Sequence, residues 1–474
     1  MGVPAVREFD PGLVYHFVGI GGYGMSGLAL ILAEAGLRVQ GSDVRPSSRT
    51  GRLRQAGVDV RIGHDPRHVD GAGVVIRSTD VPDHNPELEE ARRRGLPLWH
   101  RSDVLARILN PNRGIAVAGT HGKTTTTAMT ACALLDAGLD PTVSVGGEVA
   151  RWQGTGRLGA SPWVVAEACE SDGTFTRYRP EIAVLTNVEP EHLDHYGGSF
   201  EALKDAFRAF AAGVKPGGLI LACADDPTAL AVARSAAGTA APGVRLETYG
   251  FADGAGFQAV DAAPAPDGWS FDVVHRGRRL GRVRLSVPGR HNVANALAAL
   301  AAAVAAGVPF EAAAGSLAGY TGAQRRFQVL ASGDVTVVDD YAHHPTEIRA
   351  VLQTARERAG AGRVVAVFQP QRYTRTRSLW DGFAGAFAGA DAVILTEIYS
   401  PPGEEPLPGV SGRALAEAVA AASGVPVRFA ADRDRIPDLV EEWLEPGAVV
   451  VFMGAGDIWK VAHDFARRPR VRPA

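Results

Sequence analysis

Cysteine is scarce in this chain. Its three cysteines, Cys132, Cys169 and Cys223, stand far apart among 474 residues and form no C-x-x-C pair. Scattered cysteines in odd number do not make a disulfide framework and are typical of a reducing compartment. No Cys/His spacing fits a zinc motif, so a zinc site is disfavoured. We therefore expect a cytoplasmic protein without structural disulfides.

An excess of charge of either sign is also missing. The chain has 49 Lys and Arg against 52 Asp and Glu, a formal net charge of -3. Such a balance provides no general attraction to nucleic acid or to an anionic membrane. We expect small-molecule partners, neither nucleic acid nor a membrane, and any anionic substrate must be held by a local cluster.

Long apolar runs are absent. The most apolar helix candidates, 28–35 and 293–306, fall short of the roughly 20 residues that span a bilayer. Residues 1–10 carry charges and no apolar core, so we expect no secretory signal peptide. The alanine-rich segment 293–306 instead predicts a tightly packed internal helix.

What the chain does have is a repeated alternation of strand and helix patterns. Short apolar runs bounded by Gly, Pro or Asp alternate with helical segments, which predicts mostly parallel sheets. Stretch 245–288 is less apolar and predicts antiparallel strands at a sheet edge. Turn clusters near 111 and 322 mark linkers. The predicted fold class is α/β with three domains, at 1–111, 112–322 and 323–474.

The segment AGTHGKTTTT (118–127) follows an apolar strand and resembles a phosphate loop. Gly119, Gly122 and a helix starting near Lys123 would direct backbone N–H groups at a phosphate. Lys123 would reach the terminal phosphates and the Thr124 hydroxyl would sit on Mg²⁺. The alternative is a plain strand–turn–helix with a threonine-rich first turn. We favour an ATP site with a shortened loop.

Carboxylates and a histidine follow two further strands of the same predicted sheet. Glu167 ends WVVAE, with Glu170 and Asp172 just beyond, and AVLTNVEPEHLDHY places His192 and Asp194 just after another strand. A lone strand-end carboxylate is usually a cap or solvated. Because ligands collect at the carboxyl ends of parallel strands, this combination favours a metal-plus-phosphate or two-metal site.

The N-terminal segment GIGGYG (19–24) satisfies G-x-G-x-x-G after a strand, and Asp43 ends the next strand. The motif predicts a diphosphate at a helix N-terminus, which fits a UDP-sugar as well as NAD. A purely structural tight turn stays open as the alternative.

In the third predicted domain, two polar clusters follow strands. VVDDYAHHPTEI carries Asp339, Asp340 and two histidines, and FQPQRYTRTR carries a group of arginines. Such arginines suit a carboxylate or phosphate, so we favour a carboxylate-binding pocket over a solvated basic turn.

Arg325 and Arg326 in QRRFQ would reach nucleotide phosphate or else form a surface salt bridge.

Nine segments together resemble the ordered motifs of the Mur ligases, over about 15–460. They are GIGGYGMSGLA, AGTHGKTTTTAM, EACESDGTF, TNVEPEHLDHY, HNVANALAA, GAQRRFQ, DDYAHHPTEI, FQPQRYTRTR and GAGDI. The resemblance implies a Rossmann-like UDP-binding domain, a central P-loop-type ATPase domain and a C-terminal Rossmann-like domain that closes over ATP and brings the amino acid. It is strongest to members that add L-alanine to UDP-N-acetylmuramate.

The resemblance also implies roles for individual residues. Lys123, Glu167, His192, His343, Arg372 and Arg375 would be catalytic. ATP would contact Gly119, Thr120, His121, Gly122, Lys123, Thr124, Thr125, His291, Asn295, Arg326 and Asp340. The UDP-sugar would face Gly19, Gly21, Gly22, Gly24, Ser42, Asp43 and Ser78. Alanine would meet Tyr341, His343, Arg372 and Arg375. Mg²⁺, or Mn²⁺ in its place, would bind Thr124, Glu167 and His192.

Two positions depart from the family pattern, because Gln371 stands where the family typically has His and Cys169 where Asp is usual. Some relatives carry a carbamylated lysine, a role that we do not assign to Lys204. The alternatives are a ligase that joins a ready-made peptide to the UDP-sugar, a nicotinamide oxidoreductase, and a P-loop regulatory module. The last two leave the 119 loop or the third-domain clusters unexplained.

Overall fold

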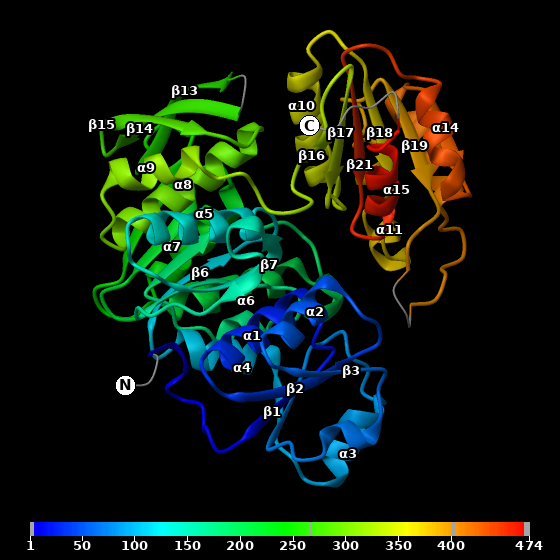
Figure 1. Ribbon diagram of the computed structural model, residues 1–474. Coiled ribbons are helices and arrows are strands. Elements are labelled where there is room, and N and C mark those ends of the chain that lie inside the picture. The colour runs from blue at the N-terminus through cyan, green and yellow to red at the C-terminus, as the bar shows by residue number, and fades with distance from the viewer. Residues whose placement is uncertain (1–3, 266–267, 401–403, 469–474) are drawn as a thin grey trace. The chain divides into compact units, whose positions relative to one another are not determined.

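The computed structural model describes residues 4–265, 268–400 and 404–468 (Figure 1). Three sheets are distributed over two compact units. The N-terminal unit takes in the described residues of Met1–Ala265, Trp269–Ser286 and Asn292–Thr321. The C-terminal unit takes in those of Pro266–Gly268, Val287–His291 and Gly322–Ala474. The predicted α/β class with three sheet-based parts is confirmed.

The first sheet of the N-terminal unit is fully parallel, in the order β3-β2-β1-β4-β5. Because β1 pairs with both β2 and β4, the sheet order reverses at β1, and the glycine loop that follows β1 lies at this switch point. The strands are β1 (Val14–Val18), β2 (Arg38–Asp43), β3 (Asp59–Ile62), β4 (Val74–Arg77) and β5 (Leu98–His100). The helices are α1 (Tyr23–Glu34), α2 (Ser48–Gln55), α3 (Pro86–Arg93) and α4 (Arg101–Leu109), with short 3-10 turns η1 (Pro4–Val6) and η2 (Pro66–Val69).

The second sheet has ten strands in the order β15-β14-β13-β12-β11-β10-β6-β9-β7-β8. Its centre is parallel, and β14–β15 and β7–β8 are antiparallel pairs. The antiparallel edge predicted for 245–288 is confirmed at β14–β15, but it is wrong for β12, which pairs in parallel with both β11 and β13. The strands are β6 (Arg113–Ala118), β7 (Thr142–Val149), β8 (Gly154–Arg157), β9 (Trp163–Glu167), β10 (Ile182–Leu185), β11 (Leu219–Cys223), β12 (Arg245–Gly250), β13 (Phe257–Ala265), β14 (Gly268–His275) and β15 (Arg278–Leu285).

Two helices beside this sheet are buried almost all round. They are α5 (Lys123–Asp136) and α8 (Arg290–Ala305), whose small alanine and threonine side chains allow close packing. The internal alanine-rich helix predicted from the sequence is confirmed. The other elements are α6 (Phe200–Ala212), α7 (Pro227–Ala237), α9 (Phe310–Ala318), η3 (Ala150–Trp152), η4 (Thr174–Arg177) and η5 (Leu193–Tyr196).

The C-terminal unit has one six-stranded sheet in the order β16-β17-β21-β18-β19-β20, parallel except for β16. Apolar helices cover both faces: α10 and α13 on one, α14 and α15 on the other. The strands are β16 (Gln328–Ala331), β17 (Val335–Asp340), β18 (Val364–Phe368), β19 (Ala392–Thr396), β20 (Val427–Ala430) and β21 (Ala448–Met453). The helices are α10 (Pro345–Ala359), α11 (Tyr373–Ser378), α12 (Trp380–Ala384), α13 (Gly412–Ser423), α14 (Ile436–Glu441) and α15 (Ile458–Phe465), with η6 (Arg433–Arg435).

Within the N-terminal unit, α1 packs backbone to backbone on β8. A Cβ on Gly27 would lie 2.9 Å from the Thr155 carbonyl oxygen, and one on Gly156 would lie 2.6 Å from the Gly27 carbonyl oxygen. Only glycine allows this approach, which joins the first sheet's leading helix to the second sheet. Among the described residues, no helix has the length and apolarity needed to cross a bilayer.

We predict that Gly27→Ala destabilises the chain by about 1–3 kcal/mol, because the added methyl group overpacks this contact. Gly51→Ala in α2 is the matched control, since nothing lies within 4 Å of a Cβ there. The control should raise stability by about 0.4–1 kcal/mol. Urea unfolding of the two variants tests this, and equal midpoints would contradict the packing described.

Candidate active site

The loop between β6 and α5 has the backbone of a phosphate cradle. Gly119 has φ +141° and Gly122, which caps α5, has φ +81°. A Cβ would lie 1.9 Å from Thr186 Oγ1 at Gly119 and 2.5 Å from Asn295 Oδ1 at Gly122. Both positions therefore require glycine. The N-terminus of α5 follows directly, where N–H groups and the helix dipole favour an anion.

The segment after β10 holds this loop in shape. Asn187 accepts from the Thr120 N–H through its carbonyl oxygen (2.9 Å) and from the His121 N–H through Oδ1 (2.7 Å). Thr186 Oγ1 donates to the His121 carbonyl (2.7 Å), and the Glu189 N–H donates to Thr120 Oγ1 (2.9 Å). Sequence reasoning missed Asn187, although it lies inside TNVEPEHLDHY, directly after a strand that pairs with β6.

Lys123 is turned back into the loop. Its Nζ donates to the carbonyls of Gly119 (2.5 Å) and Thr120 (2.9 Å) and lies 2.9 Å from Glu170 Oε2. Burial alone would lower the pKa of Lys123, but the carboxylate of Glu170 outweighs it and raises that pKa. Burial raises the pKa of Glu170, whose side chain is 1% exposed. The loop thus keeps a buried cation beside a backbone built for phosphate.

Thr124 and Glu167 meet at the carboxyl end of the same sheet. Glu167 is the last residue of β9, and its Oε2 accepts from Thr124 Oγ1 (2.9 Å) and from the Gly146 N–H (2.8 Å). A carboxylate and a hydroxyl oxygen are the donors that Mg²⁺ prefers, so these two residues fit a magnesium ion bound with nucleotide phosphate.

His192, the third residue expected at the metal, lies just past β10. It has φ +55°, precedes η5, and its Nε2 is 3.9 Å from Glu191 Oε1. Tyr196 at the end of η5 donates a hydrogen bond to the carbonyl of Glu170. This contact brings the segment after β10, which carries His192, next to the segment after β9, which follows Glu167. These are the two segments from which the sequence predicted metal ligands.

Asn295 packs against the phosphate loop from α8. Its Oδ1 accepts from Thr126 Oγ1 (3.2 Å), and its Nδ2 donates to Asn292 Oδ1 (3.1 Å). Thr125 is buried in the first turn of α5. His291, the other α8 residue expected at ATP, is exposed and groups with the C-terminal unit.

The glycine loop after β1 is held by the end of β2. The Gly21 N–H donates to Asp43 Oδ2 (2.8 Å), and Arg49 Nε donates to the Gly21 carbonyl (2.6 Å). Gly19 has φ +76°, and Gly22 caps α1, the helix that contains Gly24. Ser78 follows β4, whereas the Ser42 side chain is fully buried beneath the loop.

In the C-terminal unit, Arg325 and the two aspartates of β17 form a buried group. Arg325 Nε lies 3.3 Å from Asp339 Oδ2, and its guanidinium also donates to the carbonyls of Gly454 and Gly456. Asp340 accepts from the N–H groups of Phe327 (2.6 Å) and Ala342 (2.7 Å). Arg325 therefore connects the end of β17 to the segment that follows β21 in the same sheet. Its neighbour Arg326 lies 3.9 Å from Glu347 Oε1.

The residues expected to bind alanine lie on loops after β17 and β18. His343 Nδ1 lies 2.9 Å from the Tyr341 carbonyl, which assigns a ring proton to Nδ1. Arg372 has φ +67° and precedes α11. Arg375 donates to Gln371 Oε1 (2.6 Å), so the departure at Gln371 supplies an acceptor that orients this arginine.

The second departure, Cys169, lies between the two carboxylates after β9. Its thiol is 3.2 Å from Ser171 Oγ, and its pKa is raised by burial and by the charge of Glu170. Nearby, Asp172 accepts from Thr79 Oγ1 (2.9 Å), which links the first sheet's loops to the second sheet.

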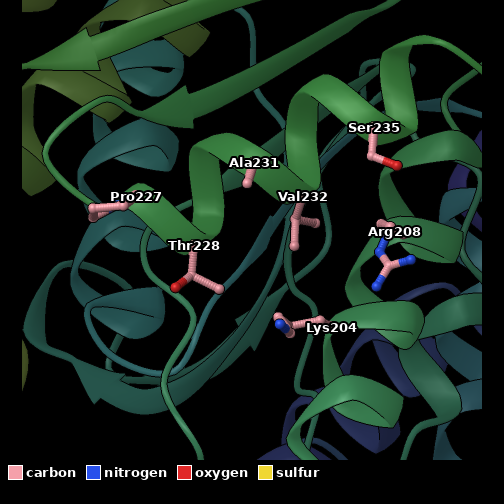
Figure 2. Close-up of a pocket in the computed structure, with 7 residues that line it drawn as sticks. All are labelled: Lys204, Arg208, Pro227, Thr228, Ala231, Val232 and Ser235. Atoms are coloured by element: carbon pink, nitrogen blue, oxygen red, sulfur yellow. The ribbon is translucent and has the colours of Figure 1, made fainter.

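Lys204 lies in a separate cavity of about 350 Å³ between α6 and α7 (Figure 2). Lys204 Nζ pairs with Glu201 (2.5 Å), and Arg208 pairs with Asp205 (2.6 Å). Pro227, Ala231 and Val232 give the opposite wall an apolar character. Because both cations are neutralised by carboxylates of α6 itself, this cavity is poorly suited to a phosphate.

We predict a pH-dependent stability that originates at Asp339 and Asp340. Burial raises the pKa of each carboxyl to about 6, and Arg325 and Arg326 oppose this only in part. The folded chain therefore holds protons that the unfolded chain releases, so stability falls as pH rises from 4 to about 6, by up to about 3 kcal/mol for each carboxyl. Asp339→Asn should remove about half of this slope, whereas Asp334→Asn, at an exposed site, should leave it unchanged. Urea unfolding between pH 4 and 7 measures it, and parallel curves would contradict it.

Three family models match successive parts of the chain: the Mur ligase family catalytic domain at 14–113, the Mur ligase middle domain at 117–303, and the Mur ligase glutamate ligase domain at 325–456. The UDP-N-acetylmuramate–L-alanine ligase of Symbiobacterium thermophilum is 53% identical over 95% of this chain and 94% of its own length. That of Pelotomaculum thermopropionicum is 44% identical over 96% and 97%.

Solved structures agree with these matches. The crystal structure of UDP-N-acetylmuramate–alanine ligase MurC from Thermotoga maritima superimposes with a TM-score of 0.81 at 30% identity, covering 97% of this chain and 99% of that one. A murein peptide ligase from Psychrobacter arcticus gives 0.70 at 26% identity, covering 96% and 98%. The resemblance seen in the motifs is confirmed, and the chain belongs to the Mur ligase family.

Proposed function

We propose that this chain is an ATP-dependent, ADP-forming ligase that joins L-alanine to the carboxyl group of UDP-N-acetylmuramate. The observation that carries the proposal is the group formed by Lys123, Thr124, Glu167 and Glu170 around a glycine-built phosphate loop. The two curated relatives described above, at 53% and 44% identity, bear the name of this activity. Peptidoglycan precursor synthesis is the corresponding process.

We assign the UDP-sugar to residues 1–111, ATP to 112–322, and the amino acid to 323–474. The family matches at 14–113, 117–303 and 325–456 support these boundaries. The switch-point loop Gly19–Gly24, with Asp43 and Ser78 at neighbouring strand ends, would take the uridine diphosphate. The described cysteines are free thiols, which supports a cytoplasmic location.

Thr124 and Glu167 would hold Mg²⁺, with His192 as a further ligand. The ion would neutralise phosphate charge when bound. Thr124 Oγ1 donates to Glu167, which keeps both oxygens at the sheet edge. The Gly146 N–H fixes the Glu167 carboxylate from the other side.

In the first step, a carboxylate oxygen of the sugar would attack the γ-phosphorus of ATP, and the bond to ADP would break. The product is an acyl phosphate, which activates a carboxyl group that is otherwise a poor acyl donor. Lys123 would exchange its contact with Glu170 for phosphate oxygens, so that its charge stabilises the transferring phosphoryl group. Positioning by the loop would supply much of the rate.

In the second step, the alanine amine would attack the acyl carbon, phosphate would leave, and the amine would lose a proton. Arg372 and Arg375 would hold the alanine carboxylate, with Arg375 oriented by Gln371. His343, whose Nδ1 is held by the Tyr341 carbonyl, would accept that proton on Nε2. Tyr341 contacts this ring edge to face at a centroid distance of 5.2 Å.

A ligase that attaches a ready-made peptide to the same sugar is the second candidate, since two murein peptide ligases resemble this chain at 26% and 31% identity. ADP release with UDP-N-acetylmuramate and either L-alanine or the tripeptide L-alanyl-γ-D-glutamyl-meso-diaminopimelate distinguishes the two activities. We expect ADP release with L-alanine. Release with the tripeptide alone would overturn the proposal.

We predict that Lys123→Ala lowers ADP release by at least about 10³-fold, because the transferring phosphoryl group loses its cation. Binding of UDP-N-acetylmuramate should stay within about twofold, since Lys123 does not contact the glycine loop. Lys204→Ala is the control, a lysine paired with Glu201 outside the site, and should behave as wild type. If Lys123→Ala ligated at the normal rate, the role of Lys123 in phosphoryl transfer would be contradicted.

A further inference from the structure

A buried carboxylate, Glu87, lies at the centre of a polar cluster in the first sheet of the N-terminal unit. It belongs to α3 and its side chain is fully buried. Oε2 lies 2.7 Å from His16 Nε2 and accepts from Ser42 Oγ at 2.7 Å. Oε1 lies 2.9 Å from His64 Nδ1 and 3.2 Å from His68 Nδ1.

These four donors match what an ionised carboxylate can accept, two hydrogen bonds on each oxygen. Burial would raise the pKa of Glu87, but the hydrogen bonds from His16, His64 and Ser42 outweigh it and hold the pKa far below its usual range. Gln40 Nε2 lies 3.2 Å from His16 Nδ1, which assigns the His16 proton to Nε2, facing Glu87. The cluster is thus a satisfied, charged network.

Ser42 connects this network to the glycine loop. Its hydroxyl donates to Glu87, while its carbonyl accepts from both the Gly19 and Ile20 N–H groups at 2.9 Å. The next residue, Asp43, accepts from the Gly21 N–H. Three consecutive loop amides therefore bond to the last two residues of β2.

The approach of this loop to β2 is close. A Cβ on Gly41 would lie 2.4 Å from the Phe17 carbonyl oxygen and 2.7 Å from Ile20 Cδ1. Because β1, the loop and β2 are in close contact, a shift of Ser42 would also displace Gly19 and Ile20. The Ser42 hydroxyl donates to Glu87 and lies 3.1 Å from His64 Nδ1, which faces the same carboxylate.

We propose that Glu87 is a positioning residue for UDP-sugar recognition, acting through Ser42 on the loop Gly19–Gly21. The inference rests on the proposed function, in which this loop receives the diphosphate. Being fully buried, Glu87 does not touch the ligand. Its role is to keep Ser42, and with it the loop backbone, in the arrangement that binds.

The test is Glu87→Gln in the full-length chain. A glutamine amide would turn an NH₂ group toward two of the four donors, so the network cannot be satisfied. We expect the Kd for UDP-N-acetylmuramate, measured calorimetrically without ATP, to rise roughly tenfold. The KM values for ATP and L-alanine should stay unchanged, which a general loss of folding would not produce.

Glu247→Gln is the matched control. Glu247 on β12 accepts from His275 Nε2 at 2.6 Å and is 10% exposed, but it lies in the second sheet, away from the glycine loop. The sugar Kd of this variant should equal that of wild type. His68→Gln removes one donor from Glu87 at a partly exposed position, and should raise the Kd about threefold if Glu87→Gln does not fold.

A double-variant cycle isolates the route through Ser42. Ser42→Ala alone should weaken sugar binding, and Ser42→Ala with Glu87→Gln should bind no more weakly than the weaker single variant. Additive losses of sugar affinity in the double variant, or an unchanged Kd in Glu87→Gln, would overturn the inference. The proposed function would stand in either case, provided that the wild-type chain binds the sugar. Failure of the wild-type chain to bind the sugar would overturn the proposed function itself.

Discussion

The buried ion pair between Lys123 and Glu170 is the interaction on which the candidate active site depends. Removing Glu170 would leave the buried ammonium group of Lys123 without its carboxylate partner, and the charge of Lys123 in turn opposes the rise that burial causes in the pKa of Glu170. The lysine also bonds to two carbonyls of its own loop, which closes the loop around its ammonium group. A phosphate would meet a cation that is already desolvated, at the helix end where backbone N–H groups converge. Once Lys123 has exchanged Glu170 for phosphate oxygens, little further reorganisation would be needed during phosphoryl transfer.

The strand order explains how this pair and its neighbours come together. Because β10, β6 and β9 are adjacent and parallel, their carboxyl ends bring Asn187, the loop at Gly119 and Glu167 to one edge. The first sheet repeats the arrangement at its own switch point, where β2 and β1 bring Asp43 and Gly21 together. In both cases a rigid strand end presents a side chain, and a neighbouring glycine loop presents backbone amides. The two anion sites of the proposed reaction follow the same physical plan.

Much of this could be read from the sequence, because strands with continuous apolar runs and loops with glycine and lysine leave clear local patterns. The strand ends carrying Glu167 and Asp340 and the loop at Lys123 were predictable for this reason. Strands β7, β8 and β16 leave no such pattern, since they are short or rich in glycine and polar residues and are stabilised by pairing. The cluster around Glu87 could not be predicted from the sequence either. Its members come from four separate segments, and Ser42 was expected to face the ligand rather than a buried glutamate.

The central claim is that the phosphate loop activates a carboxylate by forming an acyl phosphate. The most direct measurement uses UDP-N-acetylmuramate labelled with ¹⁸O in its carboxyl group, incubated with ATP and L-alanine. We expect the phosphate released to contain one oxygen from that carboxyl group, because the carboxylate oxygen that attacks the γ-phosphorus leaves with the phosphate. Phosphate free of the label, with ligation proceeding, would contradict it.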